Sequence, residues 1–269
     1  MKLLICTNGR PASREAVGYG IWLAAQLGAE VLLLGVLERE RRRATLERVL
    51  EESAESLRAQ STRFTLEVAQ GRAERVIPAA AACEKCITIV GRLQRPPWVR
   101  RTRGPSVRRL LVAIESPVIF VPAAREQLKH ALLCMGGLGM AHNMIQRARE
   151  IAVRCGTQLT LLHVVEPTTY HYPVTEALRV NQELLETDTP QARNLRQALD
   201  VLRSAGLEAN VKVRTGFIHR EIMREVHSGM YDLIGLGSHY SGAGLRPQFT
   251  PNITNEVAEH APCPALIVR

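Results

Sequence analysis

The chain contains two copies of one pattern, and this internal repeat limits its fold more than any other feature. In each copy, apolar segments of strand length alternate with amphipathic segments of helix length. The tetrapeptide Leu27-Gly28-Ala29-Glu30 corresponds to Cys155-Gly156-Thr157-Gln158, and each joins a predicted helix to the next predicted strand. Strands that alternate with helices favour a parallel sheet covered on both faces. The sequence therefore predicts two doubly wound α/β domains, over residues 1–126 and 127–269.

The predicted elements follow the same order in both copies. The first copy has predicted strands at residues 2–7, 30–37, 64–69, 86–90 and 118–121. The second copy has predicted strands at residues 131–135, 159–165, 209–213 and 265–268, and a further strand in the apolar run that ends at residue 237. We expect the first helix to run from Arg14 to Leu27, with Ser13 as its N-cap and Gly28 at its end. The second copy is longer because a polar loop occupies about residues 166–190.

Positive charge is concentrated in the first copy. The formal net charge of the chain is +9, and residues 1–126 contribute +8, with 21 Lys and Arg against 13 Asp and Glu. We find no signal peptide and no uncharged apolar run of about 18 residues, so we expect a cytoplasmic protein without a membrane span. The six cysteines are too scattered for a disulfide framework or a zinc site, so we expect no bound metal.

Two motifs near the end of the chain resemble those of a known family. One is Asp232-Leu233-Ile234-Gly235-Leu236-Gly237-Ser238, and the other is Glu-His-Ala-Pro-Cys-Pro-Ala-Leu-Ile-Val at residues 259–268. On these residues the chain resembles a tandem universal stress protein, with two UspA-like domains. The resemblance implies adenine nucleotide alpha-hydrolase-like domains, each an open five-stranded parallel sheet. It also implies that a pseudo-two-fold axis relates the domains and that their last strands pair.

The resemblance also implies where a nucleotide would bind. The family's acidic residue after the first strand falls on Asn8 and Gly136, and its adenine-contacting backbone falls near Val36 and Val164. Its phosphate loop falls on the segments that begin at Gly91 and Gly237. With their neighbours, the candidate cofactor-binding residues are Asn8, Gly9, Val36, Gly91, Gly104, Ser106, Gly136, Gly137, Val164, Gly237, Ser238 and Asn252.

The phosphate loops depart from the family's pattern in both copies. Gln94 and Tyr240 stand where the family has a loop glycine, and a β-carbon there hinders close approach of the backbone to a phosphate. Pro105 and Pro251 each remove a backbone N–H donor. Binding of ATP or AMP with magnesium therefore stays open as one interpretation, and loops that no longer bind a nucleotide are the other.

An arginine-rich segment runs from Arg92 to Arg109, where the first phosphate loop would lie. Guanidinium groups bind phosphate and carboxylate in a bidentate manner, so this segment is a candidate site for an anion or polyanion. The alternative is a solvated loop, and we expect the basic run at residues 39–43 to be a solvated helix start. No nucleic-acid recognition motif is present, so nucleic acid is not the expected partner. The candidate anion-binding residues are Arg92, Arg95, Arg100, Arg101 and Arg103.

Three functions remain open at this point. The first is a non-enzymatic stress-response module that binds a ligand or an unidentified protein partner, because no group of side chains in the sequence requires an enzyme. The second is an ATP- or AMP-binding universal stress protein, with slow ATP hydrolysis as an option. The third is binding of an anion by the arginine-rich segment. Pairing of the two domains within the chain is expected, and a homodimer is a further option.

Overall fold

The computed structural model describes residues 1–82, 86–92, 106–123, 125–136, 141–165, 184–237 and 253–268. The chain divides into two compact units, which we describe separately. The first unit comprises Met1–Glu126 together with Cys263–Leu266, and the second comprises Gln127–Pro262 together with Ile267–Arg269. The final segment of the chain therefore contributes to both units.

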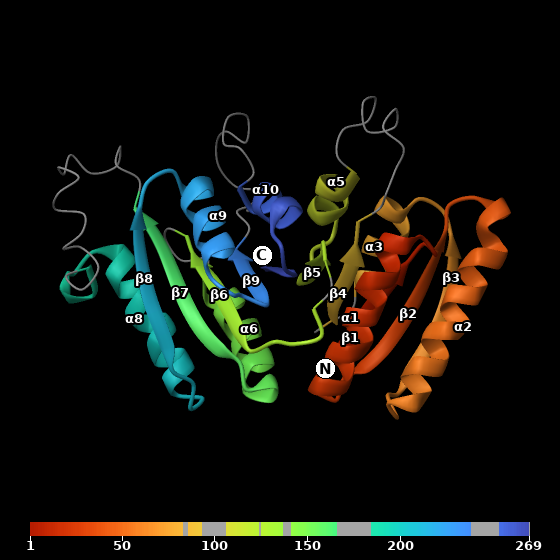
Figure 1. The fold of residues 1–269 in the computed structure, drawn as a ribbon, viewed down its shortest axis with the longest axis horizontal. Helices are drawn as coiled ribbons and strands as arrows, with labels where there is room; N and C mark the ends of the chain where they lie inside the picture. Colours follow the sequence, from red (N-terminus) through yellow and green to blue (C-terminus); the bar gives the residue numbers. More distant parts are fainter. Residues whose placement is uncertain are drawn as a thin grey trace. The chain divides into compact units, whose positions relative to one another are not determined.

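The first unit contains a parallel sheet with the strand order β3-β2-β1-β4-β5 (Figure 1). Register pairs such as Lys2↔Glu30 and Thr88↔Val118 confirm the parallel direction of the neighbouring strands. Residues of β1, β2, β4 and β5 are almost all buried, as expected for strands covered on both faces. The strands are β1 (Lys2–Thr7), β2 (Glu30–Leu37), β3 (Phe64–Gln70), β4 (Cys86–Gly91) and β5 (Val118–Val121).

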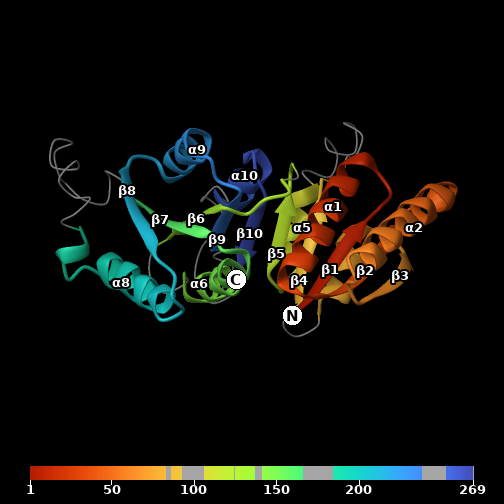
Figure 2. The ribbon, with the colours of Figure 1, turned by 60° about the horizontal axis from the view of Figure 1, so that its bottom comes forward.

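The helices of the first unit pack as two pairs, α1 with α2 and α3 with α5. Figure 2 shows α1 and α2 together beside the sheet. A β-carbon on Gly20 of α1 would meet Ile5, and one on Gly35 of β2 would meet Leu50 of α2. Ile5 pairs with Leu33 in the register, and Gly35 lies two residues beyond Leu33 on the same strand. Because alternate residues of a strand face the same side, both contacts lie on one face of the sheet. The helices are α1 (Pro11–Leu27), the 3₁₀ turn η1 (Glu40–Arg42), α2 (Arg43–Ala59), α3 (Ala73–Ala81) and α5 (Ser106–Ala113).

The start of α1 differs from the prediction. The helix begins at Pro11, with Arg10 as its N-cap residue, so the predicted start at Arg14 is wrong. The Ser13 hydroxyl instead donates to the Arg10 carbonyl at 2.8 Å and lies 2.9 Å from Oγ1 of Thr7. Proline is favoured at the first helical position because its fixed φ suits the helix and its missing N–H would have no partner there. Gly28 ends the helix with a φ of 56°, as predicted.

The second unit repeats this architecture with the strand order β10-β9-β6-β7-β8. The pairs β6–β7, β6–β9 and β7–β8 are parallel, which confirms the predicted α/β fold class. Its strands are β6 (His130–Met135), β7 (Gln158–Val165), β8 (Ala209–Thr215) and β9 (Leu233–Gly237), with the second half of β10 (Ala265–Val268), whose first half belongs to the first unit. Its helices are α6 (Ala141–Cys155), α8 (Pro190–Arg203), α9 (Ile218–Ser228) and α10 (Ile253–His260).

A buried carboxylate joins the beginning of the second unit to β9. Oδ2 of Asp232 accepts the backbone N–H groups of Lys129 at 2.8 Å and His130 at 3.1 Å, and its Oδ1 accepts Nε2 of Gln127 at 2.9 Å. Asp232 is 2% exposed, so these hydrogen bonds offset the loss of its hydration. The aspartate at the head of the first sequence motif therefore fixes the segment that precedes β6.

A second buried carboxylate lies between α9 and β8. Glu225 is 1% exposed and accepts hydrogen bonds from Lys212 at 2.7 Å, from the Tyr231 hydroxyl at 2.7 Å and from Nε of Arg214 at 2.8 Å. Burial opposes ionisation, but these donors outweigh it and lower the pKa of Glu225 to about 2. The carboxylate is therefore an ionised anchor that ties α9 to the edge strand β8.

Candidate ligand-binding site

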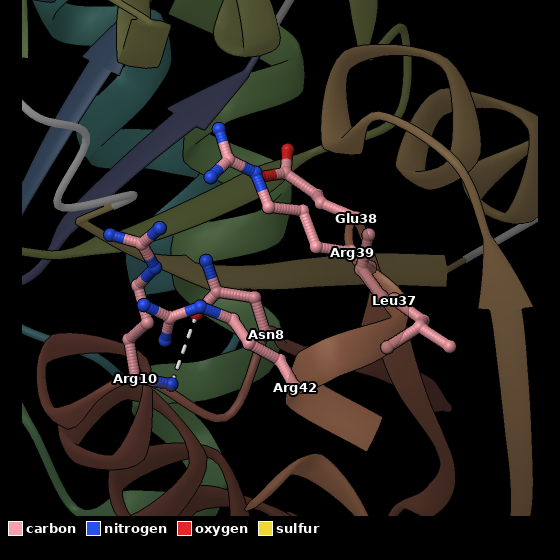
Figure 3. A pocket seen from close by; sticks show the side chains of 7 residues that line it. Asn8, Arg10, Leu37, Glu38, Arg39 and Arg42 are labelled. Atoms are coloured by element: carbon pink, nitrogen blue, oxygen red, sulfur yellow. Dashed lines mark hydrogen bonds between the residues drawn. The ribbon is translucent and has the colours of Figure 1, made fainter.

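A pocket lies at the carboxyl ends of β1 and β2 in the first unit. Open parallel sheets bind their ligands in crevices at this edge, because the loops that follow the strands converge there. Figure 3 shows the side chains of Asn8, Arg10, Arg39 and Arg42 gathered in one region, with the Leu37 side chain directed away from them. The lining residues are Asn8, Arg10, Val36, Leu37, Glu38, Arg39 and Arg42.

The turn between β1 and α1 forms one wall of the pocket. Oδ1 of Asn8 accepts the backbone N–H of Arg10 at 3.2 Å, and Oγ1 of Thr7 accepts the N–H of Gly9 at 3.1 Å. Gly9 has a φ of 72°, in the left-handed region that favours glycine. These local bonds hold the Asn8 side chain at the mouth of the pocket and set the direction of the chain into Arg10.

The end of β2 and the following 3₁₀ turn form the other wall. Val36 and Leu37 are buried, and Oε1 of Glu38 accepts the backbone N–H of Ala73 at 3.3 Å. The N–H of Arg42 donates to the Arg39 carbonyl at 3.0 Å, which closes the 3₁₀ turn. Arg39, the extended N-cap residue of this turn, and Arg42, its last residue, both line the pocket.

The pocket carries an excess of positive charge. Three arginines against one glutamate give its lining a formal charge of +2. The neighbouring carboxylates interact with Arg43 instead: Oε1 of Glu40 lies 2.5 Å from Nε of Arg43, and Oε1 of Glu47 lies 3.7 Å from its Nη1. Within the described ranges, Nε of Arg42 is buried and has no hydrogen-bond partner. The lining is therefore suited to an anion.

The space inside the pocket is small. Its volume of about 10 Å³ is near the lower limit for one water molecule, which is roughly 10–15 Å³ on the same measure. An adenine nucleotide is much larger than this space, so its binding requires lining side chains to move. A small anion needs less rearrangement.

The structure brings together only some of the predicted residues of the first unit. Asn8 and Val36 both line the pocket and Gly9 shapes its turn. Gly91 has a packing role, because a β-carbon there would lie 2.6 Å from the Ala12 carbonyl oxygen. Arg92 is exposed, and Ser106 is the first residue of α5. Five other predicted residues lie outside the described residues, namely Arg95, Arg100, Arg101, Arg103 and Gly104.

Sequence reasoning missed the arginines of the pocket. The basic run at residues 39–43 was expected to be a solvated helix start, and this expectation is wrong for Arg42, whose Nε is buried. The available signal was the spacing of Arg39 and Arg42 directly after a strand, at the edge where ligands bind. Arg10 offered a similar signal, since it follows the first strand at the same edge of the sheet.

The corresponding region of the second unit is built differently. His163 pairs with Met135 in the register of the second unit, as Gly35 pairs with Thr7 in the first unit. His163 therefore corresponds to Gly35. Its Nδ1 lies 3.1 Å from the Met135 carbonyl oxygen, and burial lowers the pKa of His163, which favours the neutral ring. Gly136 is exposed and Val164 is half-buried. The second unit therefore has an imidazole at this position, whereas in the first unit Leu50 of α2 packs against Gly35.

The other predicted residues of the second unit give less information. The Gly237 carbonyl accepts Oγ1 of Thr254 at 3.0 Å, which connects the end of β9 to α10. Gly137, Ser238 and Asn252 lie outside the described residues.

A larger hollow of about 440 Å³ lies at the opposite edge of the sheet of the second unit, where β7 and β8 begin, and includes Gln158, Leu199 and Asn210. In the described ranges, no three His, Cys, Asp or Glu side chains gather as a metal site, and no helix has the length and apolar character for crossing a membrane.

The fold and the pocket define the class of protein: an α/β protein with parallel sheets and a pocket at the carboxyl ends of its strands. Comparison with protein families then gives the identity at family level. The model of the universal stress protein family matches residues 127–269, so the chain belongs to this family. Comparison with curated proteins finds no match.

Solved structures show the same fold over the whole chain. A universal stress protein from Archaeoglobus fulgidus DSM 4304 is 16% identical, with a TM-score of 0.72 over 100% of this chain and 98% of that one. A functionally unknown protein from Pseudomonas aeruginosa PAO1 is also 16% identical, with a TM-score of 0.68 over 99% of this chain and 92% of that one. A universal stress protein solved in complex with cAMP matches 52% of this chain and 97% of its own, at 17% identity and a TM-score of 0.41.

Proposed function

We propose that this universal stress protein is a non-enzymatic, ligand-responsive module whose first unit binds a small molecule at the carboxyl ends of β1 and β2. The observation that carries this proposal is the pocket between the β1–α1 turn and the 3₁₀ turn after β2. Asn8 and Val36, the positions that the family resemblance assigns to ligand contact in this half, both line it.

The chemistry of the lining favours binding over catalysis. Arginine stays protonated at neutral pH, so Arg10, Arg39 and Arg42 offer hydrogen bonds and charge but exchange no protons with a substrate. The pocket's carboxylate, Glu38, accepts the Ala73 N–H and so helps to hold the end of β2 in place. Such a lining is suited to detecting a ligand, and a bound ligand would connect the two walls of the pocket.

We further propose that the chain is a tandem of two universal stress protein domains, over residues 1–126 and 127–269, paired within the chain through their last strands. The repeated strand order supports the tandem arrangement. In this proposal the protein acts in the cytoplasm and transmits ligand binding to a protein partner or a second copy of the chain.

The second candidate function is binding of ATP or AMP with magnesium at the same pocket. The positions of Asn8 and Val36 support it. Binding of ATP or AMP requires that the arginine side chains of the pocket move aside and that the segment after Gly91 binds the phosphate groups. The arginine-rich segment from Arg92 to Arg109 remains a third candidate, and the Arg100→Ala and Arg101→Ala double variant tests it through loss of polyphosphate binding.

Calorimetry with a ligand panel, followed by hydrogen exchange, tests the main proposal. The panel contains ATP, AMP with and without magnesium, adenosine and pyrophosphate. We expect at least one ligand to bind, and to slow amide exchange in peptides that cover residues 8–10 and 36–42. Protection confined to the second unit would contradict the proposed site, and binding of no ligand in the panel would contradict the proposed function.

A further inference from the structure

We infer that the pocket at the ends of β1 and β2 is an anion site for phosphate groups, in which guanidinium groups of Arg39 and Arg42 replace recognition of a nucleoside. This inference rests on the proposed function, since it concerns the same pocket, and it specifies the chemical class of the ligand. It places the phosphate beside β1 and β2, away from the loop after β4 where the family resemblance expects it.

The backbone brings the cationic side chains to one place. A β-carbon on Gly9 would lie 3.1 Å from the Cα of Leu46, so the β1–α1 turn directly contacts the first turns of α2. This contact places Arg10, the N-cap of α1, opposite Arg42, which directly precedes α2. Arg39, the N-cap residue of the 3₁₀ turn, lines the same pocket. Three guanidinium groups thus come from three positions of the backbone and line one pocket.

Arg39 and Arg42 are available for a ligand. Arg43 interacts with Glu40 and Glu47, the nearest carboxylates along the chain. Within the described residues, Nε of Arg42 is buried without a hydrogen-bond acceptor, and Arg39 forms no ion pair. A buried donor without an acceptor loses its hydration without compensation. A phosphate oxygen at this position would supply the missing acceptor and also neutralise positive charge.

The other lining groups restrict the ligand. Glu38 lines the same pocket, so its carboxylate disfavours an anion that binds close to it. Asn8 is neutral where the family resemblance expects an acidic residue, and an aspartate there would repel a phosphate. The small volume favours a compact anion. Inorganic phosphate, pyrophosphate and the terminal phosphate of a larger metabolite share this chemistry.

Isothermal titration of the full chain with pyrophosphate tests the inference. We expect binding that weakens at high salt. The Arg39→Gln and Arg42→Gln variants should each weaken it about tenfold, since each removes a charge-assisted hydrogen bond. Asn8→Asp retains the acceptor for the Arg10 N–H but adds a negative charge, and should also weaken pyrophosphate binding. Melting temperatures close to that of the wild type would show that these variants fold.

A matched control and a variant of the rival arginine-rich segment complete the experiment. Arg48→Gln removes an exposed arginine of α2 whose Nε lies 3.8 Å from Glu52, and it should leave binding unchanged. The Arg100→Gln and Arg101→Gln double variant should also bind normally. If Arg48→Gln or the double variant weakens binding as much as Arg42→Gln, the pocket is not the anion site.

The titration separates failure of this inference from failure of the proposed function. If adenosine or AMP binds and protects residues 8–10 and 36–42, but pyrophosphate does not bind, the pocket is a ligand site and the anion inference is wrong. If an Asn8→Asp substitution strengthens AMP binding, nucleoside recognition is indicated and the inference is again wrong. If no ligand binds, both are wrong.

Discussion

A β-carbon on Gly9 would lie 3.1 Å from the Cα of Leu46, so the β1–α1 turn and α2 meet without a side chain between them. The same turn has a left-handed Gly9 and carries Asn8 and Arg10 on either side of it. Packing of two secondary-structure elements and construction of the pocket therefore depend on the same glycine. Changes at this contact should affect both stability and ligand binding.

The first prediction concerns this contact. Gly9→Ala should destabilise the protein by about 1–3 kcal/mol, because alanine is strained at positive φ and its β-carbon would press on the backbone of α2. Denaturant unfolding measures the change. Gly18 is the matched control, since a β-carbon at this position in α1 meets no atom within 4 Å. Gly18→Ala should stabilise the protein by about 0.5–1 kcal/mol; equal effects of the two changes would refute the argument.

The second prediction separates packing from phosphate binding at Gly91. A β-carbon there would lie 2.6 Å from the Ala12 carbonyl oxygen, so Gly91→Ala should lower the free energy of unfolding by about 1–3 kcal/mol even without a ligand. At Gly136 a β-carbon meets no atom within 4 Å, so Gly136→Ala should have little effect on unfolding. If Gly91→Ala unfolds like the wild type and loses only ligand binding, Gly91 serves the ligand and not the packing.

The third prediction concerns the buried carboxylate of Glu225. Its pKa is lowered from 4.5 to about 2 in the fold, so the unfolded chain binds more protons between these values and stability rises with pH. The contribution of Glu225 is therefore present above about pH 4.5 and is lost as the pH falls toward 2. Glu225→Ala should cost about 1–3 kcal/mol at neutral pH, because it removes the acceptor of hydrogen bonds from Lys212, Arg214 and Tyr231.

The pH dependence of the difference distinguishes Glu225 from other carboxylates. Melting temperatures of the wild type and Glu225→Ala should approach each other as the pH falls from 4.5 toward 2. The control is Glu51→Ala, which removes an exposed ion pair with Arg58 of 3.2 Å and should cost at most about 1 kcal/mol at any pH. A constant difference between Glu225→Ala and the wild type across this pH range would show that the carboxylate is not the titrating group.

The fourth prediction concerns Asp232. Asp232→Asn removes the charge from three hydrogen bonds and replaces an acceptor oxygen with an NH₂ group, which should cost about 1–3 kcal/mol. Hydrogen exchange should accelerate at the amides of Lys129 and His130, which donate to this carboxylate. Asp200→Asn is the control, because Asp200 is exposed and only pairs with Arg203 at 3.4 Å. Unchanged exchange at Lys129 in Asp232→Asn would contradict the structural role.

Much of the fold was predictable from the sequence because local signals and tertiary packing agree. Strands β1, β2, β5 and β10 occupy the predicted residues, since continuous apolar runs are typical of strands covered on both faces. Gly28 ends α1 as predicted because a left-handed C-cap favours glycine. The start of α1 was not predicted correctly, since Ser13 is a good N-cap residue but Pro11 is even better suited to the first helical position.

The candidate site was less predictable. Asn8 and Val36 could be placed because they follow strands whose ends meet at one edge of the sheet. The position of Arg42 after a strand was a signal for the site, but the burial of its Nε is a result of tertiary packing that the sequence does not show. Likewise, the pairing of Arg43 with Glu40 and Glu47, which leaves Arg39 and Arg42 available, depends on side-chain conformations. The amino-acid type alone predicts a solvated side chain for Arg39, Arg42 and Arg43 alike.

The most direct test of the account is the NMR signal of the Arg42 Nε–H group during titration with pyrophosphate. This group is buried without an acceptor in the described structure, and its signal can be assigned by its loss in Arg42→Lys. We predict that the signal shifts and exchanges more slowly with water as pyrophosphate binds, whereas the Nε–H signal of Arg48 does not change. Saturable binding of pyrophosphate without any change in the Arg42 signal would contradict the account.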